Sequence, residues 1–297
     1  MAAELRAVPG RLDAVVARLL GVPRAEVQRA IETGGVLVDG LRRPKAHRLA
    51  GGERLTVDLT GVRALEPEGP AVPVRWRDEH LAVVAKPASL PSHPTEARRS
   101  GTLVNRLLGM GLPLAPGADP LRPGIVHRLD AGTSGLLLVA LDEETRDRLS
   151  AMFRRHDVER RYLALVRGIP DYERFVVDAP LGRRGARIRL DAATGRAAET
   201  AFRVLERFAR ATLLEAAPRT GRTHQIRVHL SSVGHPIVGD ARYGGGGDEA
   251  RGLGLTRPFL HSWRIAFEHP ATGQRIEVEE PLPEDLTEAL RRVRGEA

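Results

Sequence analysis

The strongest constraint on the fold is a run of seven apolar residues, Gly135–Leu141, behind a short polar loop. A run of this length is typical of a strand and too short for a buried helix, so it predicts a core strand. The loop carries Arg128 and Asp130, followed by a turn-forming Gly-Thr-Ser-Gly segment. A loop braced by a core strand can hold a carboxylate rigidly towards a cleft, which makes Asp130 the candidate reacting group. The alternative is a turn former whose side chain bonds to its own backbone.

The composition limits the available chemistry and favours a polyanionic partner. The 297 residues contain no cysteine, which excludes disulfides, thiolate metal sites and a cysteine nucleophile. The 46 Lys and Arg residues outnumber the 38 Asp and Glu residues, and the net charge of +8 favours binding to a polyanion. Nearly all basic residues are Arg, which a genome-wide coding bias would produce as readily as selection for phosphate binding.

The location of the protein follows from its hydropathy. The N-terminus lacks the basic start, apolar centre and cleavage site of a signal peptide, and no apolar run approaches the roughly 20 residues that span a bilayer. We therefore expect a cytoplasmic protein without a membrane partner. The chain length suits two folded units.

Residues 1–62 show the pattern of a small α/β unit. Apolar residues at helical spacing predict one helix from Leu12 to Leu20 and a second that starts after Pro23. Strands are predicted at Val36–Val38, which the turn pair Asp39-Gly40 closes, and at Glu53–Leu59. The Pro- and Gly-rich residues 63–73 then predict a linker, and residues 74–297 form the second, larger unit.

The small unit carries basic side chains that could neutralise several phosphates without reading a base sequence. The candidates for RNA binding are Arg11, Arg24, Arg29, Arg42, Arg43 and Lys45. A solvated basic face is the alternative. The unit also resembles the S4 RNA-binding domain, whose pattern is present as Arg11-Leu12-Asp13, Arg24, Gln28, Ile31, Gly34, Val36, Val38 and Gly40. This resemblance favours RNA docking.

The larger unit contains two long motifs. The first is H-R-L-D-A-G-T-S-G at residues 127–135, and the second is G-R-T-H-Q-I-R-V-H at residues 221–229. Both resemble signatures of the RluA/RluD-type pseudouridine synthases. Residues 234–240, G-H-P-I-V-G-D, and Tyr243 follow the second motif in the family's order. An earlier K-P-x-G-L-x-x-H-P segment is matched from Lys86, with Ser in place of its Gly.

The resemblance implies roles for individual residues. Asp130 would be the catalytic carboxylate, and Arg227 would be its ion-pair partner or a structural arginine. Arg128 would enter the gap that a flipped base leaves. The family's K-x-Y element is matched by Arg160-Arg161-Tyr162, so Arg160 would contact the substrate and Tyr162 would stack on the flipped uracil or pack in the core.

The fold that the resemblance implies is α+β, with a small S4-like α/β unit joined to a catalytic domain built on a large, mainly antiparallel sheet. The implied activity is site-specific isomerisation of uridine to pseudouridine in structured RNA. The implied substrate is large-subunit ribosomal RNA, with transfer RNA as the nearest variant. Whether Asp130 attacks the base or the sugar, or abstracts a proton, stays open. A non-catalytic RNA-binding or ribosome-assembly factor is the rival.

The remaining motifs do not indicate a metal or cofactor. His224, His229 and His235 lack the spacing that places two imidazoles on one helical face, so no metal site is expected. The glycines at 244–247 are not followed by Lys-Ser/Thr, and Ser134 is not in a nucleophile elbow. Isomerisation involves no redox change or hydrolysis, so we expect no cofactor, and no obligate protein partner is predicted.

Overall fold

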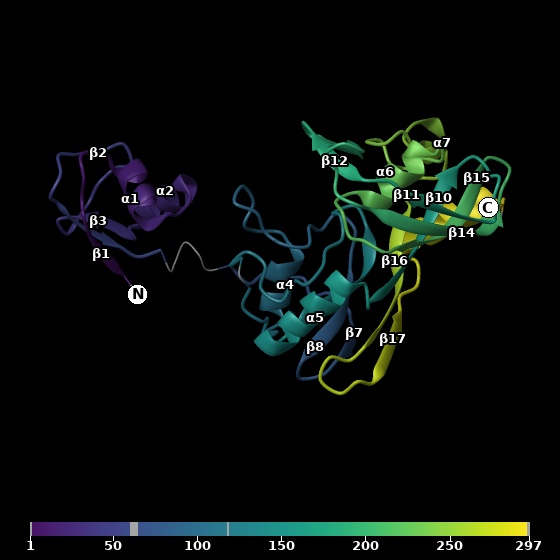
Figure 1. Cartoon of the computed structure of the whole chain (residues 1–297), viewed down its shortest axis with the longest axis horizontal. Helices are drawn as coiled ribbons and strands as arrows, with labels where there is room; N and C mark the ends of the chain where they lie inside the picture. The colour runs from purple at the N-terminus through teal and green to yellow at the C-terminus, as the bar shows by residue number, and fades with distance from the viewer. Residues whose placement is uncertain (1, 60–64, 118, 296–297) are drawn as a thin grey trace.

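The computed structural model describes residues 2–59, 65–117 and 119–295, which form a small N-terminal unit and a larger second unit (Figure 1). Each unit has its own apolar core. One cluster of buried side chains runs from Ala7 to Val57, and the others are drawn from residues 72–290. The division at residues 62 and 73 stays a prediction, because residues 60–64 lie outside the described ones.

The N-terminal unit is a four-stranded antiparallel sheet packed against two helices. The helices are α1 (Leu12–Leu20) and α2 (Arg24–Thr33), as their apolar spacing predicted. The sheet order is β1-β6-β3-β4, and a further pair is formed by β2 and β5. The strands are β1 (Ala3–Arg6), β2 (Gly10–Arg11), β3 (Val36–Val38), β4 (Leu41–Arg42), β5 (Arg48–Leu49) and β6 (Arg54–Val57).

The larger unit is built on a nine-stranded sheet in which β9 and β16 are parallel and every other pair is antiparallel. Its strands are β7 (Val74–Arg77), β8 (Leu81–Lys86), β9 (Ser134–Ala140), β10 (Glu159–Arg167), β11 (Arg174–Asp178), β14 (Glu199–Arg207), β15 (Ala211–Pro218), β16 (Leu260–Glu268) and β17 (Arg275–Glu279). A separate hairpin pairs β12 (Leu181–Arg184) with β13 (Arg187–Leu190). The predicted α+β fold with a mainly antiparallel sheet is confirmed.

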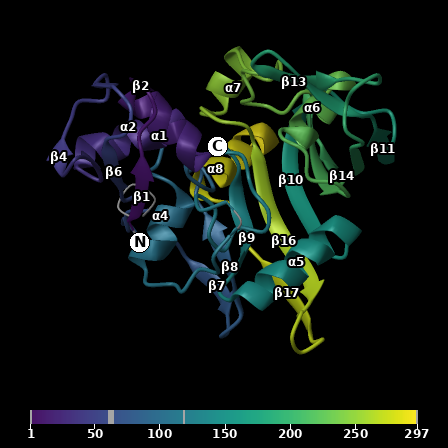
Figure 2. The same cartoon turned by 60° about the vertical axis from the view of Figure 1, so that its left-hand side comes forward.

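Helices cover both faces of this sheet (Figure 2). They are α4 (Leu103–Gly109), α5 (Glu143–Arg155), α6 (Gln225–Ser232), α7 (Asp248–Gly252) and α8 (Glu284–Arg294). One face packs against α5 through Leu149 and Met152, whereas the other packs against α4, α6 and α8. Because β9 lies between two apolar layers, all seven of its residues are buried.

The loop between Arg122 and Ser134 reaches the sheet at Gly135, the second residue of β9. Gly135 has a positive φ of 112°, and a Cβ there would stand 2.2 Å from the Ser262 carbonyl oxygen. Only glycine permits β9 to run this close to β16. The predicted core strand is confirmed, and the loop before it is anchored at a fixed point.

The predicted linker is packed on the larger unit over the part that the structure describes. The Asn105 side chain donates to the Glu66 carbonyl oxygen at 2.9 Å, and the Glu68 N–H donates to the Asn105 carbonyl oxygen at the same distance. Val72 is buried among the core residues of α4. Residues 66–72 therefore belong physically to the surface of α4. None of the helices in residues 2–59, 65–117 and 119–295 is long and apolar enough to cross a bilayer.

Candidate active site

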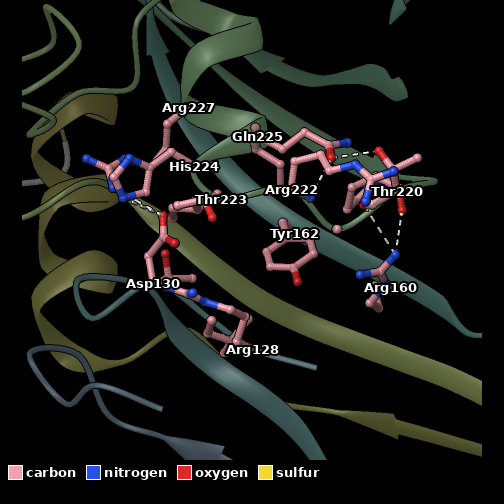
Figure 3. Close-up of a pocket in the computed structure, with 16 residues that line it drawn as sticks. Arg128, Asp130, Arg160, Tyr162, Thr220, Arg222, Thr223, His224, Gln225 and Arg227 are labelled. Carbon is pink, nitrogen blue, oxygen red and sulfur yellow. Dashed lines mark hydrogen bonds and ion pairs between the residues drawn. The ribbon is translucent and has the colours of Figure 1, made fainter. Parts of the chain in front are cut away.

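Asp130 lies on the loop before β9 and is directed into a pocket (Figure 3). Its backbone carbonyl oxygen accepts from the Thr133 N–H at 3.0 Å, which closes the turn. Its carboxylate Oδ2 instead accepts from Arg227 Nη1 at 3.1 Å. The side chain is 16% exposed, so the carboxylate is held while one side of it meets the pocket. The side chain therefore does not serve as the turn former that the alternative interpretation required.

Arg227 projects from α6 and is shared between two carboxylates. Its Nε and Nη2 donate to Asp240 at 2.7 and 2.9 Å, and its Nη1 donates to Asp130. Its guanidinium also lies 5.0 Å from the centroid of the Tyr243 ring. Burial opposes the charged form, but the Asp240 and Asp130 carboxylates outweigh it and raise the pKa of Arg227. The expected Asp130–Arg227 ion pair is confirmed.

His224 is a second neighbour of Asp130. Its Nε2 lies 4.0 Å from Asp130 Oδ2, and its Nδ1 is 2.7 Å from the Tyr243 hydroxyl. The residue has a positive φ of 56° at the N-terminus of α6, which turns the ring back into the pocket. Burial lowers the pKa of His224, so the imidazole is neutral at neutral pH.

Tyr162 lies on β10, in the middle of the same pocket. Figure 3 shows its ring between Asp130 on one side and Arg160 on the other. The residue is 6% exposed, and burial raises the pKa of its phenol, although the Arg160 charge opposes this. The hydroxyl therefore stays protonated at neutral pH. Its position suits contact with a base, and core packing accounts for part of its burial because the ring also belongs to the main apolar cluster.

The Arg160 side chain is hydrogen-bonded to the backbone at the end of β15 and in the loop before α6. Its Nη2 donates to the carbonyl oxygens of Pro218, Arg219 and Thr220 at 3.1 to 3.4 Å, and its guanidinium lies 5.4 Å from the Phe153 ring centroid. Burial lowers the pKa of Arg160. The side chain orders the wall of the pocket, and direct contact with a substrate stays a prediction.

Arg128 differs from its neighbours because it is exposed at the mouth of the pocket. Within the described residues its guanidinium forms no hydrogen bond or ion pair with another side chain. An arginine without a protein partner beside a pocket is free to contact an RNA, as the sequence interpretation requires.

Lys86 supports the site and was not singled out from the sequence. It is 1% exposed, and its Nζ donates to the carbonyl oxygens of Pro87 and Leu90 at 2.8 Å and of Ala131 at 3.3 Å. Burial lowers the pKa of Lys86 to about 7, although the Asp130 charge opposes the shift. The signal in the sequence that could have identified Lys86 is the Lys86-Pro87 pair, which matches the K-P pair of a family segment. Lys86 fixes the residue that follows Asp130.

The basic candidates of the small unit are organised by one buried acid. Asp13 has no exposed side-chain surface and accepts from Arg11 at 2.9 Å, Arg24 at 3.1 Å and Gln28 at 2.7 Å. Burial opposes ionisation, but the bonds from Gln28, Arg11 and Arg24 outweigh it and lower the pKa of Asp13. Arg11 and Arg24 keep about half of their side-chain surface exposed, so the cluster presents two guanidinium groups to solvent.

The other four basic candidates are dispersed. Arg29 pairs with Glu96 of the larger unit at 2.8 Å, and Lys45 pairs with Glu32 at 2.9 Å. Arg42 lies against Gly34, where a Cβ would stand 2.1 Å from its Nη2, and Arg43 is exposed. Arg29 therefore joins the two units, a role that the helix pattern alone did not indicate.

The described residues hold no group of three His, Asp or Glu side chains placed to bind a metal ion. His224 contacts Tyr243, whereas the Nδ1 of His229 lies 2.9 Å from the Thr200 hydroxyl, and the Nδ1 of His235 lies 2.9 Å from the Arg167 carbonyl oxygen. The three imidazoles thus have separate local partners. The expectation of no cofactor remains a prediction.

A pocket with an arginine-bound aspartate, a buried tyrosine and a basic rim, in a chain that also carries a unit of paired helices and exposed arginines, has the features that an RNA-acting enzyme needs. Comparison with known proteins names the class. The model of the RNA pseudouridylate synthase family matches residues 80–232, and the S4 domain model matches residues 10–55. The chain belongs to the RNA pseudouridylate synthase family, whose members are isomerases, and the predicted S4 domain is confirmed.

Individual relatives extend this similarity over almost the whole chain. The chain is 38% identical to the ribosomal large subunit pseudouridine synthase D of Nitrosomonas europaea, over 96% of this chain and 85% of the relative. It is 36% identical to the corresponding synthase C of Vibrio cholerae, over 93% and 90%. The solved structure of human RNA pseudouridylate synthase domain containing 4 matches with a TM-score of 0.59 at 25% identity, over 74% of this chain and 92% of that one.

Proposed function

We propose that this protein converts uridine to pseudouridine at defined positions of large-subunit ribosomal RNA, with Asp130 as the catalytic residue. The observation that carries the proposal is the ion pair of 3.1 Å between Asp130 and Arg227 at the wall of a pocket that Tyr162 also lines. The pairing holds the carboxylate in one orientation, which the chemistry needs before an RNA arrives.

The reaction moves the uracil from an N1 to a C5 linkage on ribose C1′. The bond between C1′ and N1 breaks, the base turns over, and C1′ bonds to C5. C5 loses one proton and N1 gains one, so the product has the same atoms as the uridine. The exchange is balanced without an oxidant, a reductant or water, so a carboxylate and a closed pocket suffice. Arg227 and His224 approach Oδ2 of Asp130, which leaves Oδ1 for the substrate within the part of the chain described.

Reaching the target requires removing the uridine from its stack, at a cost of a few kcal/mol. Arg128 is exposed at the pocket mouth and is suited to fill the vacated position, because a planar guanidinium stacks on bases and binds phosphate. Tyr162 would then contact the face of the flipped uracil. Its raised pKa favours a stacking role over removal of the C5 proton, because the phenol is the poorer base when it stays protonated.

The choice of RNA rests on the relatives. The synthases of Nitrosomonas europaea and Vibrio cholerae carry the large ribosomal subunit in their names, and the S4 unit presents the Asp13-held arginines Arg11 and Arg24 as a second RNA contact. Transfer RNA is the nearest alternative substrate. Ribosomal RNA as substrate also supports the predicted cytoplasmic location.

The proposal is tested by mapping pseudouridine in ribosomal and transfer RNA from cells with and without the gene. Complementation with wild type and with Asp130→Ala provides the internal control. We expect specific sites in large-subunit ribosomal RNA to disappear, to return with wild type, and to stay absent with the variant.

An unchanged map, together with no product from the purified protein on unmodified transcripts, would favour a non-catalytic RNA-binding factor. Loss of sites only from transfer RNA would keep the activity and correct the substrate. Restoration by Asp130→Ala would remove Asp130 from the catalytic role.

A further inference from the structure

A second cavity of about 590 Å³ adjoins the catalytic pocket. The two share part of their walls, namely Arg128, Arg160, Thr220, Gly221 and Arg222. Figure 3 shows Arg160 on the side of Tyr162 opposite Asp130, which is where the shared wall begins. Most of the remaining wall comes from the loop before Asp130 and from the end of α5. His93, between β8 and α4, and Arg196, between β13 and β14, complete it. An RNA strand that delivers a uridine to Asp130 therefore has this cavity next to it.

The lining of this cavity is strongly basic. Its six arginines are Arg122, Arg128, Arg154, Arg160, Arg196 and Arg222, and its lining includes no Asp or Glu. Arg122 pairs with Asp119 at 3.0 Å, whereas Arg154 and Arg196 are exposed and form no side-chain ion pair within the described residues. Burial and the nearby charge of Arg196 lower the pKa of Arg222. Like charges that crowd together without a carboxylate favour an anionic occupant.

Two histidines in the same lining leave buried nitrogen atoms without a hydrogen-bond partner. His127 Nε2 accepts from the Leu138 N–H at 2.9 Å, so in the neutral ring Nδ1 carries the proton, and this Nδ1 is unpartnered. His93 Nδ1 is also buried without a partner. Buried polar atoms are normally satisfied, so an unpartnered donor at a cavity points to an acceptor from outside the chain.

We propose that this basic cavity binds backbone phosphate next to the target uridine, with Arg154 and Arg196 as ligands that the catalytic pocket does not use. The inference rests on the proposed function for the identity of the RNA strand, but the cavity and its charge do not depend on it. The cavity fixes the path of the strand and so sets which uridine enters the pocket.

A phosphate fits this cavity better than a stacked base. The aromatic side chain in its wall, Phe153, is already covered by the His127 ring, which stacks at 4.6 Å, and by the Arg160 guanidinium at 5.4 Å. The ring therefore offers no stacking surface to a nucleotide. The remaining polar groups donate, and phosphate oxygens accept from arginine in a planar, two-bond geometry.

The test compares the double variant Arg154→Gln/Arg196→Gln with a control, Arg77→Gln/Arg174→Gln, made at exposed arginines outside both cavities. The probe is a fluorescent single-stranded ten-residue uridine oligonucleotide, and binding is measured by anisotropy across a salt series. We expect the dependence of log K on log salt to weaken by about 0.7 for each phosphate that the double variant no longer binds, and the control to match wild type. An unchanged salt dependence in the double variant overturns the inference.

Pseudouridine formation on unmodified large-subunit transcripts is measured in parallel. A weaker salt dependence with an active wild type supports both the cavity and the function. A weaker salt dependence with an inactive wild type supports the cavity and removes the proposed function. A failure of the phosphate-binding inference and a failure of the proposed function are therefore distinguishable, because the binding assay needs no turnover.

The position of the phosphate is tested with neutral methylphosphonate linkages placed singly beside a uridine that wild type modifies. One adjacent linkage should weaken wild-type binding roughly threefold to tenfold and leave the double variant unaffected, since the variant has no arginines at 154 and 196 to bind that phosphate. Equal decreases for both proteins at every adjacent linkage would show that the arginines do not bind the flanking phosphates, and would overturn their assignment.

Discussion

The catalytic pocket and the S4 unit both contain a cluster of aspartate and arginine, but with opposite proportions. In the pocket, the single guanidinium of Arg227 is shared by Asp130 and Asp240, so the cluster has one excess negative charge. In the S4 unit, the single carboxylate of Asp13 is shared by Arg11 and Arg24, so the cluster has one excess positive charge. We expect the same kind of ion pair to give a reactive carboxylate in one place and an RNA-binding surface in the other.

The difference also lies in which partner is buried. Asp240 and Asp13 have 1% and 0% of their side chains exposed and act as fixed anchors. The groups that face outwards, Asp130 at 16% and Arg11 and Arg24 at about half, are the ones that we expect to meet RNA. A buried anchor holds a functional charge in place without competing for the ligand. Substituting a buried anchor and substituting an outward-facing residue should therefore have different effects on stability, rate and RNA affinity.

The largest effect is expected from Asp130→Asn. Asparagine keeps the size of the side chain but is neither a nucleophile nor a base, so single-turnover product formation should fall by at least about 10⁴-fold. RNA affinity should stay within a few-fold of wild type, because removing a negative charge does not weaken attraction to a polyanion. Rapid-quench assays and anisotropy measure the two quantities. Asp147→Asn, on the exposed face of α5, is the control, and an equal rate for Asp130→Asn would contradict the assignment.

Asp240→Asn should affect both stability and rate. It removes the bidentate partner of Arg227 and leaves a buried guanidinium with only Asp130, at a cost of about 3 kcal/mol in the free energy of unfolding. Tilting Arg227 should misplace Asp130 and slow turnover by roughly 10². The matched control is Glu206→Gln. Glu206 binds Arg294 through two nitrogen atoms as well, but the two side chains are 37% and 34% exposed, so its removal should cost under about 1 kcal/mol.

Urea unfolding and single-turnover kinetics distinguish these outcomes. If Asp240→Asn changed neither quantity, Arg227 would not need its second carboxylate, and the anchor interpretation of the pocket would be wrong. If stability fell while the rate stayed constant, Asp240 would be a structural residue only.

Some elements of both units follow from the local sequence, whereas the contact between Asp130 and Arg227 does not. The strand at Gly135–Leu141, the two helices of the S4 unit and the Asp39-Gly40 turn follow from local periodicity and turn chemistry, which depend only on neighbouring residues. The Asp130–Arg227 pair joins residues 97 positions apart, and the family resemblance supplied it. No periodicity relates two such residues, because loop approach is decided by tertiary packing.

Sequence reasoning did not identify the buried charged residues that hold the functional side chains in place. Asp240 and Lys86 stood inside matched segments, yet nothing local distinguishes a buried charge with several partners from a solvated one. Arg29, which is predicted to bind RNA, pairs with Glu96, 67 positions away, and its contact with RNA stays a prediction. A charged side chain receives its partner from packing at long range, so its type and spacing indicate a role only where a family pattern identifies that partner.

The S4 cluster should respond to Asp13→Asn with weaker RNA binding and an unchanged rate at saturation. Without the carboxylate, two arginine side chains lose the order that Asp13 imposes, and restoring it on binding costs about 1 kcal/mol for each side chain. We expect affinity to fall by about thirtyfold and saturated single-turnover rates to stay the same. Glu32→Gln, which releases the exposed Lys45, is the control. A lower saturated rate with unchanged affinity would contradict the separation of the two clusters.

The smallest effect is expected from acid, through His224. Burial keeps the pKa of this imidazole below its ordinary value of 6.5, so it is neutral at pH 7 and gains a proton only as the pH falls further. The new charge would lie 4.0 Å from Asp130 Oδ2, in a cluster that also includes Arg227, Arg242 and Asp240, and would give the Asp130 carboxylate a second cationic neighbour beside Arg227. An interaction of about 1 kcal/mol would slow the fully protonated enzyme about fivefold, so the wild-type rate should fall as the pH drops below 6.5. His224→Gln cannot titrate, so the variant should show the flatter single-turnover profile between pH 5 and 8. Identical profiles would mean that the charge on His224 does not reach the reacting carboxylate.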